Sequence, residues 1–426
     1  MKRTLRNLRT SVWRHRDLRL AGPGRALSVL GDEIALIALM LHVHDSGAGT
    51  RGVMLLLGAA ALPTVLLAPW AGRLADRVDS RVLTVASALG QLLACVALAV
   101  AGPLWLVYLL VMALQAGQAV SSPTWQALVP RIVGPDEVGR AVGATQALTT
   151  LAAVGGAPLG GLLAGLGGQR LALLADAATF GVLAVVALAV RTRRAGAHDA
   201  TLALARAAAA DRPKALDGLR VARRDALLWP ILSALMVYVV VGEATNVVEV
   251  FLVRDALHGT SVQYGLVGMA VTLGIVGGSL LAGRASGARA LAVVTVIAAA
   301  VQAAAVLGAG LAPSIVAVIG AFAVLGVANG ALNTSTSTLV LTRVPDQQLG
   351  QVNAALNGMA RGFSIGALLL GAWAGGVLGP QRTFVASGVA CLLVAGWLAV
   401  RVHSAARPTL ARWQTSDDQA TTTAPG

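Results

Sequence analysis

Long apolar runs separated by short polar segments make up most of the sequence. A helix needs about 20 predominantly apolar residues to cross the hydrocarbon core of a bilayer, and twelve runs are close to this length. We therefore predict an all-α integral membrane protein with twelve transmembrane helices. The expected helices cover residues 18–43, 52–72, 82–101, 103–129, 137–166, 171–190, 228–253, 262–283, 289–311, 313–341, 348–376 and 381–401.

The composition supports this interpretation. The chain has 426 residues, of which 56% are hydrophobic and 12% charged, whereas about a quarter of a soluble domain is charged. Its 49 glycines would weaken soluble helices, but small residues let helices pack closely in lipid. Cys95 and Cys391 both fall inside expected helices, far apart in the chain, so no disulfide framework is predicted.

The distribution of charge predicts the orientation of the chain. Only four of the 33 lysines and arginines lie in the loops that follow odd-numbered helices. Basic residues accumulate on the cytoplasmic side of a membrane, so we predict a multi-pass membrane protein with both termini in the cytoplasm. The formal net charge of +14 also suits a nucleic-acid-binding protein, but aromatic residues are scarce and not interleaved with the basic ones. This pattern argues against nucleic acid as a partner.

Short motifs recur at a nearly constant spacing. Ala71-Gly72-Arg73 is repeated as Ala282-Gly283-Arg284, and the acid that ends Leu30-Gly31-Asp32 is matched by Glu243 in Val241-Gly242-Glu243. The pattern indicates two parallel six-helix repeats, an architecture known among secondary transporters. Further matched pairs are Gln118 with Asn329, Ser122 with Asn333, Pro135 with Pro345, and Gly155 with Gly366.

The repeats divide the chain into four predicted parts. We expect an N-terminal six-helix bundle at residues 1–190, a basic cytoplasmic linker at 191–227, a C-terminal six-helix bundle at 228–404 and a cytoplasmic tail at 405–426. Within the linker, residues 214–225 combine leucines with basic neighbours, which is typical of a helix that lies on a membrane surface. The alternative is a simple tether between the two bundles.

A charged, turn-forming segment at residues 71–81 joins the second and third expected helices. It resembles the signature of the major facilitator superfamily, Gly-x-Leu-Ala-Asp-Arg-x-Gly-Arg-Arg/Lys, and the likeness to that superfamily extends over nearly the whole chain. Asp79 and Ser80 stand where glycine and arginine are usual. The residues that match the signature are Gly72, Leu74, Ala75, Asp76, Arg77 and Arg81.

Four other segments are similar to a narrower group, the twelve-helix drug:proton antiporters that include macrolide exporters and the enterobactin exporter. The fifth helix also carries Gly156-Ala157-Pro158-Leu159-Gly160-Gly161, an imperfect copy of the antiporter motif Gly-Pro-x-x-Gly-Gly. This resemblance implies export in exchange for protons. The four segments are Leu30-Gly31-Asp32, Ala61-Leu62-Pro63 ahead of Ala68-Pro69, residues 123–130 (PTWQALVP) and Asp217-Gly218-Leu219-Arg220.

Carboxylates inside the expected helices are the first candidates for chemistry, because each costs about 2.5–3.5 kcal/mol to insert. Asp32 and Glu243 occupy equivalent positions in the two repeats, and the resemblance places their helices around a central cavity. Burial disfavours an ionised carboxylate and hydration favours it. We therefore expect both residues to couple transport to protons; the alternative is that they only tie helices together.

Three other acids lie within expected helices, and we expect different roles for them. Glu33 lies about 100° round the helix from Asp32, which favours a structural or secondary role. Asp176 is expected to bridge helices, and Glu249 lies near the outer end of the seventh helix. Arg361 is the basic residue inside the eleventh helix; it should either pair with an acid or face an aqueous cavity in a gating role.

The resemblance also implies a cytoplasmic gate and a polar cavity lining. Asp76 is expected near the N-terminus of the eleventh helix in the outward-facing state, where the positive helix end favours its charge. Gly72, Arg77 and Arg81 are expected to complete this gate. The polar residues expected to line the substrate cavity, or else to join helices, are Gln118, Asn246, Asn329 and Asn333.

The sequence shows no sign of an enzyme. It contains no phosphate-binding Walker A loop and no nucleophile motif, and His42 and His44 lack further ligands nearby for a zinc site. We predict neither a cofactor nor a metal. The expected function is proton-coupled efflux of small amphipathic molecules or drugs by a monomer in the lipid bilayer. The alternatives are a dedicated exporter of one metabolite or siderophore, and a transporter-like sensor that moves nothing.

Overall fold

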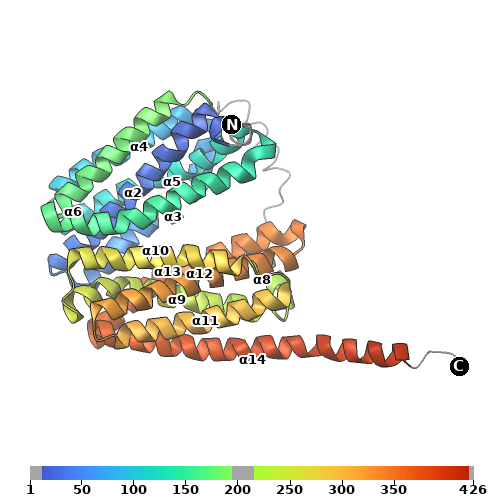
Figure 1. Ribbon diagram of the computed structural model, residues 1–426. Coiled ribbons are helices and arrows are strands. Elements are labelled where there is room, and N and C mark those ends of the chain that lie inside the picture. The colour runs from blue at the N-terminus through green and yellow to red at the C-terminus, as the bar shows by residue number, and fades with distance from the viewer. Residues whose placement is uncertain (1–11, 194–214, 422–426) are drawn as a thin grey trace, which may run out of the picture. The chain divides into compact units, whose positions relative to one another are not determined.

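The computed structural model describes residues 12–193 and 215–421, and these ranges are almost entirely helical (Figure 1). The helices of the first part are η1 (Val12–Arg14), α2 (Arg16–Asp45), α3 (Gly49–Arg77), α4 (Ser80–Val100), α5 (Leu104–Val133), η2 (Pro135–Glu137) and α6 (Val138–Ala189). Those of the second part are α8 (Ala215–Arg224), α9 (Leu228–Phe251), η3 (Leu252–Ala256), α10 (Ser261–Ala282), α11 (Ala288–Leu311), α12 (Ile315–Arg343), α13 (Asp346–Leu378) and α14 (Pro380–Thr421).

Helix α6 contains two membrane-crossing lengths. Its 52 residues would extend about 78 Å at 1.5 Å per residue, far more than the roughly 30 Å hydrocarbon core. The backbone leaves helical geometry at Gly167 and Gly168, and Gly168 has φ of 65°, a conformation that favours glycine. In the described ranges, eleven helical stretches are long and apolar enough to cross a membrane. Counting α6 twice gives the twelve predicted spans.

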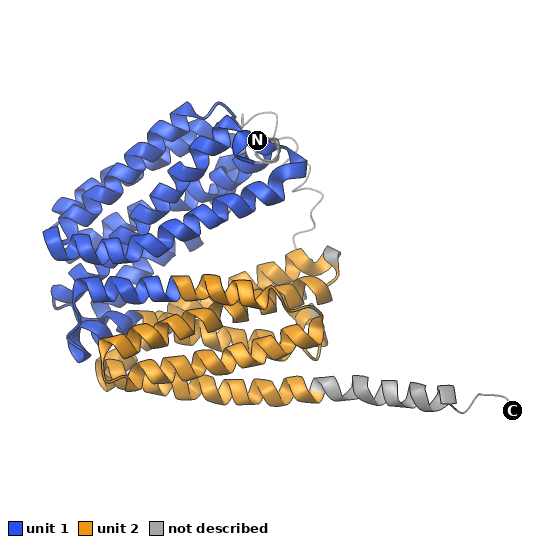
Figure 2. Cartoon of the chain, viewed as in Figure 1, with its two compact units in different colours: residues 1–211, 247–272 blue, residues 212–246, 273–426 orange. Residues whose placement is uncertain are grey.

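The chain forms two compact units (Figure 2). Unit 1 comprises residues 1–211 and 247–272, and unit 2 comprises residues 212–246 and 273–426. The end of α9 and the start of α10 therefore pack with the N-terminal helices. The domain boundaries at residues 190, 227 and 404 remain predictions.

The same pattern of helix neighbours occurs in both units. In unit 1, α2 and α4 contact α6, while α3 and α4 contact α5. In unit 2, α11 contacts α12 and α14, Gly330 of α12 lies against Ile275 of α10, and Gly371 of α13 lies against Ala244 of α9. Matching helices of the two halves thus have matching neighbours, which confirms the predicted pair of six-helix repeats.

Glycines set the close approach of α2 to both lengths of α6. A Cβ atom at Gly160 would lie 2.9 Å from the carbonyl oxygen of Ile34, and one at Gly24 would lie 3.1 Å from the Cγ atoms of Val186. The second contact belongs to the sixth span and the first to the fifth. Small residues are needed here because they let the helix backbones come together.

Large apolar side chains are exposed along many of the helices. Val316 is 74% exposed, Trp105 65% and Trp373 61%. Extensive apolar exposure is unfavourable in water, but it is expected of side chains that face lipid. The outer surface and the interior of this protein are therefore both apolar. Polar side chains in the interior are the exception, and they indicate where a functional site lies.

Candidate functional site

Asp32 of α2 belongs to a three-residue polar network in unit 1. The Nε2 atom of Gln118, on α5, donates to Asp32 Oδ2 at 3.0 Å. The Oε1 atom of the same amide accepts from Arg25 Nη1 at 3.3 Å. All three side chains are partly buried. Gln118 therefore joins a carboxylate of α2 to a guanidinium of the same helix.

The sequence reasoning missed Arg25. It precedes Asp32 by seven residues, which is two helical turns and places both on the same side of α2. That spacing was the signal that could have found it. Gln118 lies in the fourth expected helix, and the arginine that contacts it comes from the first.

The other acids near Asp32 have structural surroundings. Asp176 is fully buried; it accepts from Cys95 Sγ on α4 at 3.2 Å and from Thr179 Oγ1 at 3.1 Å, and it packs against Gly31. It therefore bridges helices, as expected from the sequence. Glu33 points elsewhere: a Cβ atom at Gly156 of α6 would lie 2.6 Å from Glu33 Cβ.

In unit 2, Glu243 of α9 accepts a hydrogen bond from Ser364 of α13. The distance from Ser364 Oγ to Glu243 Oε1 is 2.9 Å, and the carboxylate is partly buried. Arg361 lies one turn before Ser364. Its side chain is exposed, and it pairs with no carboxylate within the described ranges. Of the two roles expected for Arg361, this favours a side chain that faces an aqueous cavity over one that pairs with an acid.

The predicted cavity-lining residues are divided between the two units. Gln118 is part of the Asp32 network in unit 1. Asn333 Nδ2 donates to Asn329 Oδ1 at 3.0 Å, one turn away on α12, and Asn246 of α9 is exposed. Their role in a substrate cavity stays a prediction. The contact of Ser364 with Glu243 was not predicted. The one signal in the sequence is that Ser364 is a hydroxyl residue one helical turn from Arg361.

The segment at residues 71–81 is helical over most of its length, which corrects the expectation of a turn-forming segment. Helix α3 continues to Arg77, and α4 begins at Ser80. Only Val78 and Asp79 lie between them, both with negative φ, so the turn needs no glycine. Asp79 Oδ1 accepts from the backbone amides of Arg81 and Val82, which caps α4.

The predicted gate residues have different surroundings. Gly72 has open space around it, Arg77 is exposed, and the side chain of Asp76 lies outside the described part of the chain. Arg81 donates from Nη2 to the carbonyl oxygen of Val190, at the end of α6. Here Arg81 closes the end of the sixth helix, because terminal carbonyls lack partners inside a helix.

The start of the linker is also held by the first helix. Asp17 of α2 is buried, and its Oδ2 atom accepts from the backbone amides of Arg191 at 3.1 Å and Thr192 at 2.7 Å. The Thr192 hydroxyl donates to the same oxygen at 2.6 Å. The chain therefore leaves α6 in a fixed direction.

A second cluster joins the end of α2 to η3 within unit 1. His44 Nε2 lies 2.7 Å from Asp255 Oδ1, and His44 Nδ1 lies 2.8 Å from Asp45 Oδ1. Arg254 Nη2 is 3.6 Å from Asp45 Oδ1. Since carboxylates only accept, both contacts of His44 are hydrogen bonds when its ring is doubly protonated. Among the described residues, no group of histidine, cysteine and acidic side chains could hold a metal ion.

Comparison with known families assigns this helical architecture. The model of the Major Facilitator Superfamily matches residues 22–365 and 244–420. The chain belongs to the Major Facilitator Superfamily. It is thus a multi-span membrane transporter, as the signature at residues 71–81 implied.

Relatives and solved structures agree with this assignment. The chain is 26% identical to an uncharacterised MFS-type transporter, YfiS of Bacillus subtilis, over 87% of this chain and 89% of that protein. It is 21% identical to macrolide efflux protein A of Streptococcus pyogenes, over 61% of this chain and 64% of that protein. A bacterial homologue of the lysosomal transporter Spinster, inward-facing and occupied, has a TM-score of 0.70 at 15% identity and covers 92% of this chain and 98% of its own.

Proposed function

We propose that this transporter exports small amphipathic molecules from the bacterial cytoplasm in exchange for protons, by alternating access. It would act as a monomer in the inner membrane with both termini in the cytoplasm. The observation that carries the proposal is the network of Asp32, Gln118 and Arg25. An intramembrane carboxylate is expensive, and among the described residues this one is hydrogen-bonded by an amide and makes no direct ion pair.

The surroundings of Asp32 suit an acid that binds and releases protons. Gln118 donates to the Asp32 carboxylate, and Arg25 is linked to that carboxylate by hydrogen bonds through the amide of Gln118. A direct Arg–Asp ion pair would hold the carboxylate ionised more strongly. The indirect link leaves protonation accessible when the surroundings of Asp32 become drier. Loading from the more acidic outside and release to the cytoplasm would then drive export.

Three further observations support the proposal. Glu243, equivalent to Asp32 in the sequence repeat, also has a polar rather than a basic partner, Ser364. The glycine motif of the fifth span packs closely on its neighbours, as Gly161 lies against Ser261 of α10. Macrolide efflux protein A, a partial match, makes a macrolide a sensible first compound for testing.

Transport by inverted vesicles with an imposed proton gradient tests the proposal. Adding a macrolide, or compounds from a broad drug panel, is expected to release protons from vesicles that contain the wild-type protein. The variant Asp32→Asn should abolish this release, because a side-chain amide does not take up a proton at the pH of such an assay. Binding of drug need not be lost.

Glu33→Gln is the matched control, since it removes one carboxylate from the adjacent position of the same helix. Glu33 faces Gly156, so this variant should keep drug-driven proton release. Equal loss in both variants, or full activity in Asp32→Asn, would contradict the role of Asp32. A wild-type protein that releases no protons with any compound of the panel would refute antiport itself.

A further inference from the structure

A hollow lined by two arginines lies in unit 2, where the start of α9 meets α14. Its volume is about 370 Å³, within the range of about 300–1,000 Å³ typical of small-ligand sites. The lining includes Arg223, Asp225, Trp229, Arg401 and Ser404. Neither the candidate proton-coupling site nor the predicted gate uses any of these residues.

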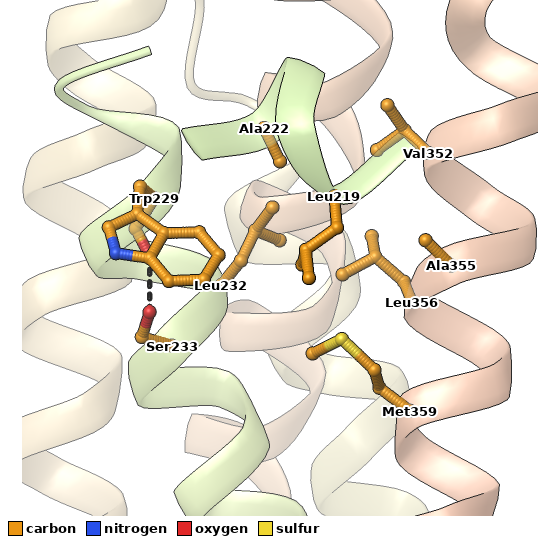
Figure 3. A pocket seen from close by; sticks show the side chains of 9 residues that line it. All are labelled: Leu219, Ala222, Trp229, Leu232, Ser233, Val352, Ala355, Leu356 and Met359. Atoms are coloured by element: carbon orange, nitrogen blue, oxygen red, sulfur yellow. Dashed lines mark hydrogen bonds between the residues drawn. The ribbon is translucent and has the colours of Figure 1, made fainter. Parts of the chain in front are cut away.

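Helix α8 packs against α13 beside this hollow. Its Leu219 and Ala222 share a small apolar pocket with Leu356 and Met359 of α13 (Figure 3). The apolar side of this linker helix therefore packs on protein, and its arginines remain outside. Arg223 is held further by the ring of Trp229, since Arg223 Cζ lies 5.1 Å from the ring centroid, a cation–π contact.

Among the described residues, the one acid that lines the hollow, Asp225, does not neutralise its two arginines. The Oδ1 atom of Asp225 caps α9 through the amides of Leu227 at 2.8 Å and Leu228 at 2.9 Å. Arg343 Nη1 also contacts both of its oxygens, at 2.9 and 3.0 Å. Within the described ranges, Arg223 and Arg401 are exposed and pair with no carboxylate.

The hollow lies at the level of a predicted membrane boundary. Arg223 and Trp229 flank the start of the seventh expected span, 228–253, and Arg401 ends the last one, 381–401. The charge distribution places both boundaries on the cytoplasmic side. Tryptophan is enriched at this depth, and anionic phospholipids attract basic residues there.

We propose that this hollow binds the phosphate group of an anionic phospholipid from the cytoplasmic leaflet. The guanidinium groups of Arg223 and Arg401 hold the phosphate, because planar guanidinium groups match its oxygens with two parallel hydrogen bonds. Trp229 packs against the glycerol part of the headgroup. A lipid bound here joins the linker helix α8 to the last span α14.

Thermal unfolding of the full-length protein in detergent tests this site. Cys95 and Cys391 are free and buried, so a thiol-reactive fluorogenic dye reports unfolding. Short-chain phosphatidylglycerol is expected to raise the melting temperature saturably, whereas short-chain phosphatidylcholine and inorganic phosphate raise it little. In the double variant Arg223→Gln/Arg401→Gln, half-saturation should need roughly thirtyfold more phosphatidylglycerol, since each of the two arginines contributes to binding an anionic lipid.

Arg224→Gln is the matched control, because Arg224 is exposed on the same helix but does not line the hollow. Equal protection by phosphatidylcholine, or an equal loss in Arg224→Gln, would overturn the site. Equal protection by inorganic phosphate would assign it to a soluble anion instead of a lipid. If the double variant does not fold, native mass spectrometry of the wild type decides: no preferential retention of phosphatidylglycerol over phosphatidylcholine refutes the proposal.

Discussion

Replacing Gly160 by alanine tests the packing of the first helix on the fifth span. The added Cβ would lie 2.9 Å from the carbonyl oxygen of Ile34 and 3.0 Å from both Ile34 Cα and Ile37 Cβ. Two of these atoms belong to the backbone of α2, so no side-chain rotation relieves the contact. Helices α2 and α6 must move apart by several tenths of an ångström.

The expected cost is that of overpacking a well-packed interior, about 1–3 kcal/mol of the free energy of unfolding. For a compact unit of about 240 residues, each kcal/mol changes the melting temperature by roughly 2–4 °C. Gly160→Ala should therefore melt about 2–12 °C below the wild type. The thiol-dye assay reads this change through Cys95, which is buried in the same unit.

Gly155→Ala is the control for the helix preference of alanine. It lies in the same glycine-rich stretch, and its added Cβ would meet nothing within 4 Å. Its melting temperature should equal or slightly exceed that of the wild type, because alanine favours a helix over glycine by up to about 1 kcal/mol. If Gly160→Ala melts like the wild type, or if both variants fall equally, the close approach of the helices is not what stabilises this unit.

Two more variants test polar contacts. Gln118→Leu removes the bridge between Arg25 and Asp32. Drug-driven proton release in vesicles should fall about tenfold, because hydrogen bonds to charged groups contribute about 1.5–3 kcal/mol. Unchanged release would show that the bridge is dispensable. Asp17→Ala leaves two backbone amides at the start of the linker without their acceptor, so the free energy of unfolding should fall by about 1–3 kcal/mol. Exposed Asp136→Ala is its control, and a melting temperature that is equal in both would contradict the anchor.

The sequence allowed the transmembrane helices and the paired acids to be predicted because both are visible in the residue types along the chain, without knowledge of tertiary contacts. An apolar run of about 20 residues has few alternatives to a spanning helix, and a carboxylate inside it is conspicuous. Asp32 and Glu243 were proposed as proton-coupling residues in this way, and that role stays a prediction. Their partners Arg25 and Ser364 were missed, because a hydrogen bond between helices depends on which faces meet, and the apolar pattern does not distinguish those faces.

The segment at residues 71–81 shows the same limit on a smaller scale. Its charges and its position between two apolar runs placed the connection between the second and third helices correctly. They did not show that α3 would continue to Arg77 and that Asp79 would cap α4. Helix ends depend on the local satisfaction of backbone groups, which a search for charged, turn-forming residues overlooks.

The sequence by itself determined that this chain is a twelve-helix, duplicated membrane protein, because lipid requires every spanning segment to be long, apolar and internally hydrogen-bonded. Only the tertiary structure decided which polar groups meet: Gln118 between Arg25 and Asp32, Asp17 on the linker, and two arginines around one hollow. Hydrophobicity drives helices into the membrane but does not select their neighbours. Close glycine contacts and a few hydrogen bonds make that selection, and they exist only once the helices are packed.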